Sequence, residues 1–112
     1  MTILLLFYLG ASLLLIALSI PMIMGRVKPN GWYGFRTPLT LDHPEIWYPV
    51  NRYAGKRLLG LGIVIFLAAI GLPLLLDIDL DDYAIWIAVI TLVGLGVAFF
   101  MGWRYSHQLA GE

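Results

Sequence analysis

Three long apolar stretches limit what this chain can fold into. They cover residues 3–24, 58–76 and 83–103, and none has a charged side chain in its interior. Because a helix rises about 1.5 Å per residue, roughly 20 apolar residues cross the hydrocarbon core of a bilayer. The whole chain is 61% hydrophobic and only 12% charged, whereas soluble domains are about 25% charged. We therefore expect an all-α integral membrane protein with three transmembrane helices, forming a single membrane domain over residues 1–112.

The first apolar stretch also has to be compared with a signal peptide. A signal peptide begins with basic residues and has an apolar core of about 7–15 residues. Here Met1 and Thr2 precede a longer apolar run, and neither side chain is basic. We expect a retained membrane helix.

The charged residues are divided between the two connections. Of the seven Lys and Arg residues, Arg104 follows the third stretch and the others lie within residues 25–57, whereas residues 77–82 contain only acidic charges. Cationic residues next to membrane helices stay in the cytoplasm. This pattern predicts a multi-pass protein of the cell membrane with a cytoplasmic loop and C-terminus and an outer N-terminus. The acidic turn lacks the glycine and distal glutamate of a calcium loop, so we expect solvated charges there.

The third stretch has small residues at every fourth position. Gly94, Ala98 and Gly102 share one helix face, which lets a neighbouring backbone approach closely. Packing against the other helices of the chain and packing in a homo-oligomer are both compatible with this face.

The polar segment 25–57 begins with turn-forming residues. Pro29, Asn30 and Gly34 favour tight turns, and Pro38 favours an extended backbone at the residue before it. We expect a structured, irregular loop here. Arg36 lies inside it, and either its guanidinium bonds to loop carbonyls and holds the loop shut, or it binds a ligand or partner.

The second half of this segment has the pattern of a helix. Asp42 and Glu45 have the spacing of a capping box, which predicts a helix from about His43 towards the second membrane helix, bent at Pro49. At spacing four, one helix face contains Trp47, Asn51 and Gly55, and the next contains Tyr48, Arg52 and Lys56. We expect Asn51 to be a buried polar anchor and the cations to face phosphates or water.

The residue types of the loop favour binding over catalysis. Thr37, Thr40 and His43 lack the surrounding pattern of an activated nucleophile. Asp42, Glu45 and His107 are weak metal candidates, since a helix start already explains the two carboxylates. We expect no catalytic residue, metal or cofactor. Basic pockets beside membrane helices bind anionic lipid head groups, so membrane lipids are expected partners, and nucleic acid is not.

The loop also resembles a known family. The run P-N-G-W-Y-G-F-R-T-P-L-T-L from Pro29, followed by W-x-x-x-N-R-x-x-G-K from Trp47, is similar to the SdpI-type immunity proteins, of which this would be a short three-helix member. The resemblance implies a membrane protein of bacteria or archaea that gives immunity to a peptide toxin, takes part in signalling, and binds a toxin or a cytoplasmic regulator. The alternative is a lipid- or small-molecule-handling membrane enzyme or carrier that uses the same loop.

Two sets of candidate site residues follow from the loop and the resemblance. The ligand- or partner-binding set is Asn30, Arg36, Thr37, Thr40, Trp47, Asn51, Arg52 and Lys56. The set expected to shape the loop is Pro29, Gly34, Pro38 and Gly55.

Overall fold

The computed structural model describes residues 2–111 as four helices. They are α1 (Thr2–Ile23), α2 (Pro38–Asp42), α3 (Pro44–Leu75) and α4 (Leu80–Leu109). No strand occurs in this part of the chain, and α1, α3 and α4 are long and apolar enough to cross a membrane. The predicted all-α fold with three spanning helices is confirmed. The molecule measures 49 × 25 × 19 Å.

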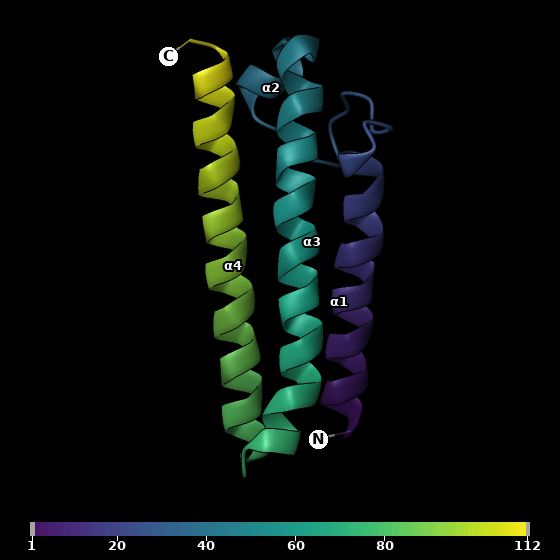
Figure 1. Ribbon diagram of the computed structural model, residues 1–112, viewed down its shortest axis with the longest axis vertical. Coiled ribbons are helices and arrows are strands. Elements are labelled where there is room, and N and C mark those ends of the chain that lie inside the picture. Colours follow the sequence, from purple (N-terminus) through teal and green to yellow (C-terminus); the bar gives the residue numbers. More distant parts are fainter. Residues whose placement is uncertain (1, 112) are drawn as a thin grey trace.

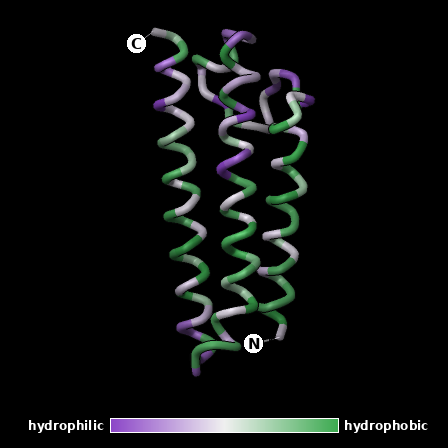
Figure 2. Tube along the Cα trace, in the orientation of Figure 1, coloured by the Kyte–Doolittle hydropathy of each residue, from purple (hydrophilic) through white to green (hydrophobic). Residues whose placement is uncertain are grey.

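The three long helices stand side by side with α3 in the middle (Figure 1). Helix α3 packs against both α1 and α4. The connection that contains α2 lies at the same end as the C-terminus, and the turn between α3 and α4 lies at the end of the N-terminus. Figure 2 shows hydrophobic residues along the length of the helices and hydrophilic residues gathered at the two ends. The bundle thus has an apolar middle and two polar ends.

Helices α1 and α3 touch through small residues. A Cβ added at Gly55 would lie 3.1 Å from the carbonyl oxygen of Ser19, and one added at Gly62 would lie 3.1 Å from that of Ser12. Both serines are fully buried, and each hydroxyl donates to a carbonyl of its own helix three residues earlier. The contact between α1 and α3 therefore leaves the hydroxyls of both serines hydrogen-bonded, and the two backbones approach closely at Gly55 and at Gly62.

Helix α4 packs against α3 and against the loop. At its start the Asp79 carboxylate accepts a hydrogen bond from the Asp82 amide at 2.8 Å, which caps the helix. Further along, a Cβ added at Gly94 would run into Leu61 of α3, and one added at Gly102 would lie 2.7 Å from the ring of Phe35. The small-residue face of α4 thus has contacts within the same chain.

Some local predictions differ from the structure. The helix predicted from about His43 begins at Pro44 and continues through Pro49 and Pro73 to Leu75, so half of the expected loop is the first part of α3. The predicted capping box was wrong, because His43 occupies the N-cap of α3 with no side-chain cap and Asp42 is the last residue of α2. The capping box occurs five residues earlier, in the short helix that Pro38 begins.

Candidate functional site

The site is the connection between α1 and α3, residues 24–43, which folds onto the first turns of α3; we call it the loop platform. Trp47 of α3 is fully buried beneath it, and its indole N–H donates to the Val27 carbonyl at 2.8 Å. Val27, Phe35 and Trp47 belong to one apolar cluster that also includes Met22 of α1. The indole thus joins the loop platform to α3 by both packing and a buried hydrogen bond.

Asn51, one helical turn after Trp47, holds the middle of the loop platform. Its side chain is only 2% exposed. The amide oxygen accepts from the Phe35 N–H at 2.7 Å, while the amide nitrogen donates to the Phe35 carbonyl at 3.3 Å and to the Trp47 carbonyl at 3.0 Å. One amide therefore satisfies both backbone groups of a buried loop residue, as predicted for a buried polar anchor.

Gly34 is required for this contact. Its φ is +107°, and a Cβ there would lie 2.6 Å from the Asn51 amide oxygen. Side chains rarely adopt this backbone conformation, whereas glycine does so at little cost. The loop can therefore approach Asn51 only because residue 34 has no side chain.

Thr37 and Thr40 form the capping box of α2. The Thr40 amide donates to the Thr37 hydroxyl at 3.2 Å, and the Thr37 amide donates to the Thr40 hydroxyl at 2.8 Å. The Thr40 side chain is fully buried, and its hydroxyl also donates to the Phe35 carbonyl at 3.2 Å. Both threonines thus shape the loop platform, and Phe35 is held from two sides.

Asn30 and Arg36 order the outer part of the loop platform. The Asn30 amide oxygen accepts from the backbone N–H groups of Trp32 at 2.9 Å and Tyr33 at 2.6 Å, which makes an Asx-type turn. The Arg36 guanidinium donates to the Gly31 carbonyl. This is the loop-closing bond anticipated for Arg36, although the side chain stays exposed and can still meet a partner.

The two other candidate cations lie on α3. Arg52 donates from Nε to the Ile23 carbonyl at 3.1 Å, at the last residue of α1. The side chain of Lys56 is exposed one turn further on. Arg52 thus ties α1 to α3, whereas Lys56 remains available to water or phosphates.

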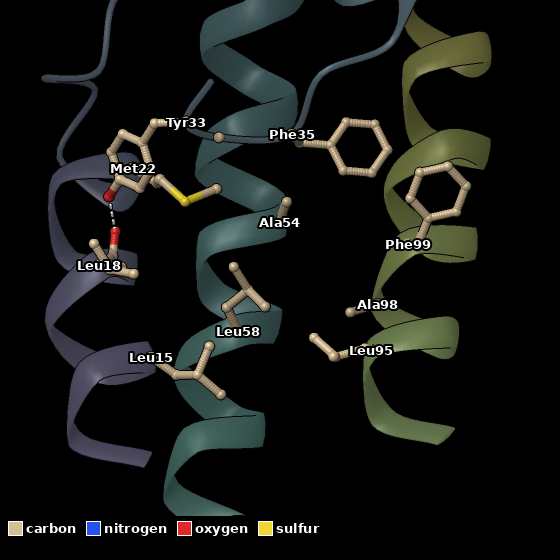
Figure 3. Close-up of a pocket in the computed structure, with 11 residues that line it drawn as sticks. Leu15, Leu18, Met22, Tyr33, Phe35, Ala54, Leu58, Leu95, Ala98 and Phe99 are labelled. Carbon is tan, nitrogen blue, oxygen red and sulfur yellow. Dashed lines mark hydrogen bonds between the residues drawn. The ribbon is translucent and has the colours of Figure 1, made fainter. Parts of the chain in front are cut away.

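Tyr33 fixes the loop platform to α1. Its hydroxyl donates to the Leu18 carbonyl, as the dashed line in Figure 3 marks. Burial raises the pKa of the Tyr33 hydroxyl from its ordinary value of 10.0, so the donor stays protonated at neutral pH.

A cleft of about 390 Å³ lies beneath Tyr33 and Phe35, between α1 and α4 and over α3 (Figure 3). Its lining is almost wholly apolar, and the Phe35 ring packs against Phe99 of α4 with centroids 5.3 Å apart. No nucleophile or carboxylate lines it. Within residues 2–111 no cluster of His, Asp and Glu is arranged to hold a metal ion. The apolar lining of the cleft suits an apolar molecule.

The sequence did not predict which residues of the loop platform form hydrogen bonds with Trp47 and Asn51. Val27 and Phe35 are the loop partners of Trp47 and Asn51, and the only signal for these two was their place near a predicted turn. Trp32 of the loop platform is 81% exposed. The structure thus separates an inward layer, packed on α3 and α1, from an outward surface.

A family model described as the SdpI/YfhL protein family matches residues 26–104, which covers the loop platform, α2, α3 and most of α4. No curated protein and no solved structure has a significant match to the chain.

Proposed function

The chain belongs to the SdpI/YfhL protein family, and on that premise we propose that it is a non-catalytic membrane protein of the immunity and signalling type. In this proposal the loop platform binds a partner, either a peptide toxin or a cytoplasmic regulator.

One observation supports this proposal above the others: a hydrogen-bonded loop presents a largely exposed aromatic side chain. Asn51, Trp47 and Thr40 hold the inward side, while Trp32 is 81% exposed. Exposed tryptophans on an ordered backbone make strong contacts in interfaces, because little conformational entropy is lost on binding. The loop platform has the form of a binding surface prepared in advance.

The charge of the same surface favours an acidic partner. Arg26, Lys28 and Arg36 are all exposed on the loop platform. Cationic surfaces attract acidic partners and increase their association rate. A peptide or protein segment that combines an apolar pocket for Trp32 with carboxylates around it would match this surface, and anionic lipid head groups would compete for the same cations.

We also propose that the loop platform faces the cytoplasm. Its cations and Arg104 lie at one end of the bundle, and the aspartates of residues 77–82 lie at the other. The chain has no cysteine, so Gly31→Cys and Asp79→Cys can each be labelled with an impermeant maleimide on intact cells. Labelling of Asp79→Cys alone is expected. Labelling of Gly31→Cys from outside would reverse the orientation and remove a cytoplasmic regulator from consideration.

The binding role is tested with cells that lack their own immunity protein and are exposed to a family peptide toxin. The unaltered chain is expected to raise survival at least tenfold. Trp32→Ala should abolish this protection, and Trp86→Ala should retain it. Trp86 is the matched control, because it is also exposed, at 54%, but lies on α4 near the other end of the bundle. Equal membrane levels are checked by immunoblot. Absence of protection by the unaltered chain would contradict immunity, and protection by Trp32→Ala would contradict the surface.

The cleft of about 390 Å³ favours a second candidate, a carrier of small apolar molecules or lipids. Leu95 lines this cleft and is 40% exposed, so Leu95→Trp fills it from α4 while every residue of the loop platform is kept. If the chain is a carrier, Leu95→Trp abolishes activity and Trp32→Ala does not, which is the reverse of the pattern expected for partner binding.

A further inference from the structure

A second groove runs along α3 and α4, next to the cleft under the loop platform, and Ala98 lines both. Its lining from α4 includes Val93, Val97 and Met101, which recur every four residues and so form one stripe. Val64 of α3 lines the facing side, and the groove has a volume of about 480 Å³. Gly94 lies in its wall and adds no side chain. This groove is a continuous apolar channel open to the surroundings of the bundle.

The groove ends in a polar pocket at the end of the bundle where the C-terminus lies. Met101 lines both, and the pocket of about 360 Å³ is also lined by Arg104, Tyr105 and Gln108. Arg57 lines the groove near this junction. The channel therefore passes from apolar walls to two guanidinium groups, an amide and a phenol.

The two arginines are positioned without a carboxylate partner. The Arg57 guanidinium lies 4.5 Å from the centre of the Tyr53 ring, and that ring lies 4.5 Å from the ring of Tyr105. Neither Arg57 nor Arg104 is in a salt bridge within residues 2–111. Aromatic contact orients a guanidinium and leaves its N–H donors available. Arg57 at the end of the groove and Arg104 in the adjoining pocket thus offer the kind of donors that bind a phosphate group.

The length of the groove fits one leaflet of a bilayer. Its α4 lining extends from Val89 to Met101, which at 1.5 Å per residue is about 18 Å of helix. Half of the hydrocarbon core is about 15 Å. An acyl chain whose head group lay at Arg57 and Arg104 would therefore run along the groove to about the middle of the bilayer.

We propose that this groove binds one anionic phospholipid, with its phosphate at Arg57 and Arg104 and an acyl chain along the stripe of Val93 and Val97. The proposal goes beyond the function proposed above, because no residue of the loop platform takes part. Charge distinguishes the lipid from a second copy of the chain. A second copy inserted in the same orientation brings its own two arginines to the same level, and like charges repel, whereas a phosphate neutralises them.

Native mass spectrometry of the purified protein with added phosphatidylglycerol or phosphatidylcholine of identical chains tests the head-group site. At least fivefold more bound phosphatidylglycerol than phosphatidylcholine is expected. The double variant Arg57→Gln, Arg104→Gln should remove most of this preference. The double variant Arg26→Gln, Lys28→Gln removes two exposed cations of the loop platform and should lower the preference much less. Arg104→Gln alone should lower it as well, and because Arg104 has no hydrogen bond or ion pair in residues 2–111, its replacement does not threaten folding. An equal effect of both double variants, or no effect of either, would overturn the proposal.

The apolar part is tested separately with Val97→Trp, which fills the groove. Val97 is 52% exposed and lines the groove, whereas Ile85 is 58% exposed on the same helix and does not. Val97→Trp should lower retained phosphatidylglycerol at least threefold and Ile85→Trp should not change it. Unchanged retention in Val97→Trp would exclude the groove as the site of the acyl chain.

Discussion

Removing the side-chain amide of Asn51 should release the loop platform from α3. The amide is 2% exposed and is the partner of the Phe35 N–H, at 2.7 Å. The Phe35 carbonyl keeps a second donor in Thr40, so Asn51→Ala leaves one buried N–H unpaired. An unpaired buried donor costs about 1–3 kcal/mol, and the cavity left by the smaller side chain adds on the order of 1 kcal/mol. Asn51→Ala is therefore expected to lower the free energy of opening the loop platform by about 2–4 kcal/mol.

Trypsin cleavage after Arg36 measures this opening. The bond that is cut joins Arg36 to Thr37, one residue beyond Phe35, and Arg36 itself is exposed. When closing is faster than cleavage, the rate follows the population of the open form. A cost of about 2–4 kcal/mol corresponds to a rate increase of about 30-fold to 1,000-fold. The fragments 1–36 and 37–112 are identified by mass, which separates this cut from cleavage at other basic residues.

Two further variants make the measurement decisive. Gln108→Ala removes an exposed amide from α4 and should leave the cleavage rate within a factor of two. Asn51→Leu nearly preserves the volume and removes every hydrogen bond of the amide, so it should also cleave at least tenfold faster than the unaltered chain. Cleavage of Asn51→Leu at the original rate would refute the reasoning, because packing alone would then hold the loop platform.

Three other changes test neighbouring contacts. Gly34→Ala places a Cβ 2.6 Å from the Asn51 amide oxygen at φ +107°, so faster cleavage after Arg36, or loss of folded protein by size-exclusion chromatography, is expected. A Cβ at residue 102 lies 2.7 Å from the ring of Phe35, whereas a Cβ at residue 96 has no neighbour within 4 Å. Gly102→Ala should therefore lower the melting temperature in detergent by several degrees, and Gly96→Ala should leave it unchanged. Burial raises the pKa of Tyr33 above 10.0 in the folded state. The stability that its protonated hydroxyl contributes is therefore full below pH 10.0 and is lost as the pH rises through the higher folded pKa. Tyr33→Phe should remove this increase in cleavage at alkaline pH.

The local part of the site was predictable because helical spacing is a short-range property. Trp47, Asn51 and Gly55 share one face at spacing four, and all three are buried in the structure. An asparagine on such a face has to find partners, so a polar anchor followed from its neighbours alone. The bond of Arg36 to a loop carbonyl was likewise one of two expected alternatives.

The capping box shows where local reasoning was insufficient. Asp42 and Glu45 have the right spacing, yet the cap that forms uses Thr37 and Thr40. The cap that forms has a threonine where the sequence rule expects Glu or Gln, so the rule did not predict it. The choice depends on the burial of Thr40, whose hydroxyl also bonds to the Phe35 carbonyl, and a sequence pattern contains no information on that contact.

The sequence by itself determined the three membrane helices, the polar loop between the first two, and the separation of cationic from acidic ends, because length, hydropathy and charge act segment by segment. Only the tertiary structure decided that Phe35 meets Asn51 and that Val27 meets Trp47, across 16 and 20 residues. It also placed Arg57 of α3 in a groove and Arg104 of α4 in a pocket that share Met101 in their lining. Such pairs depend on the path of the chain between the helices. A buried polar group needs a hydrogen-bond partner, and the path of the chain decides which residue lies close enough to provide it.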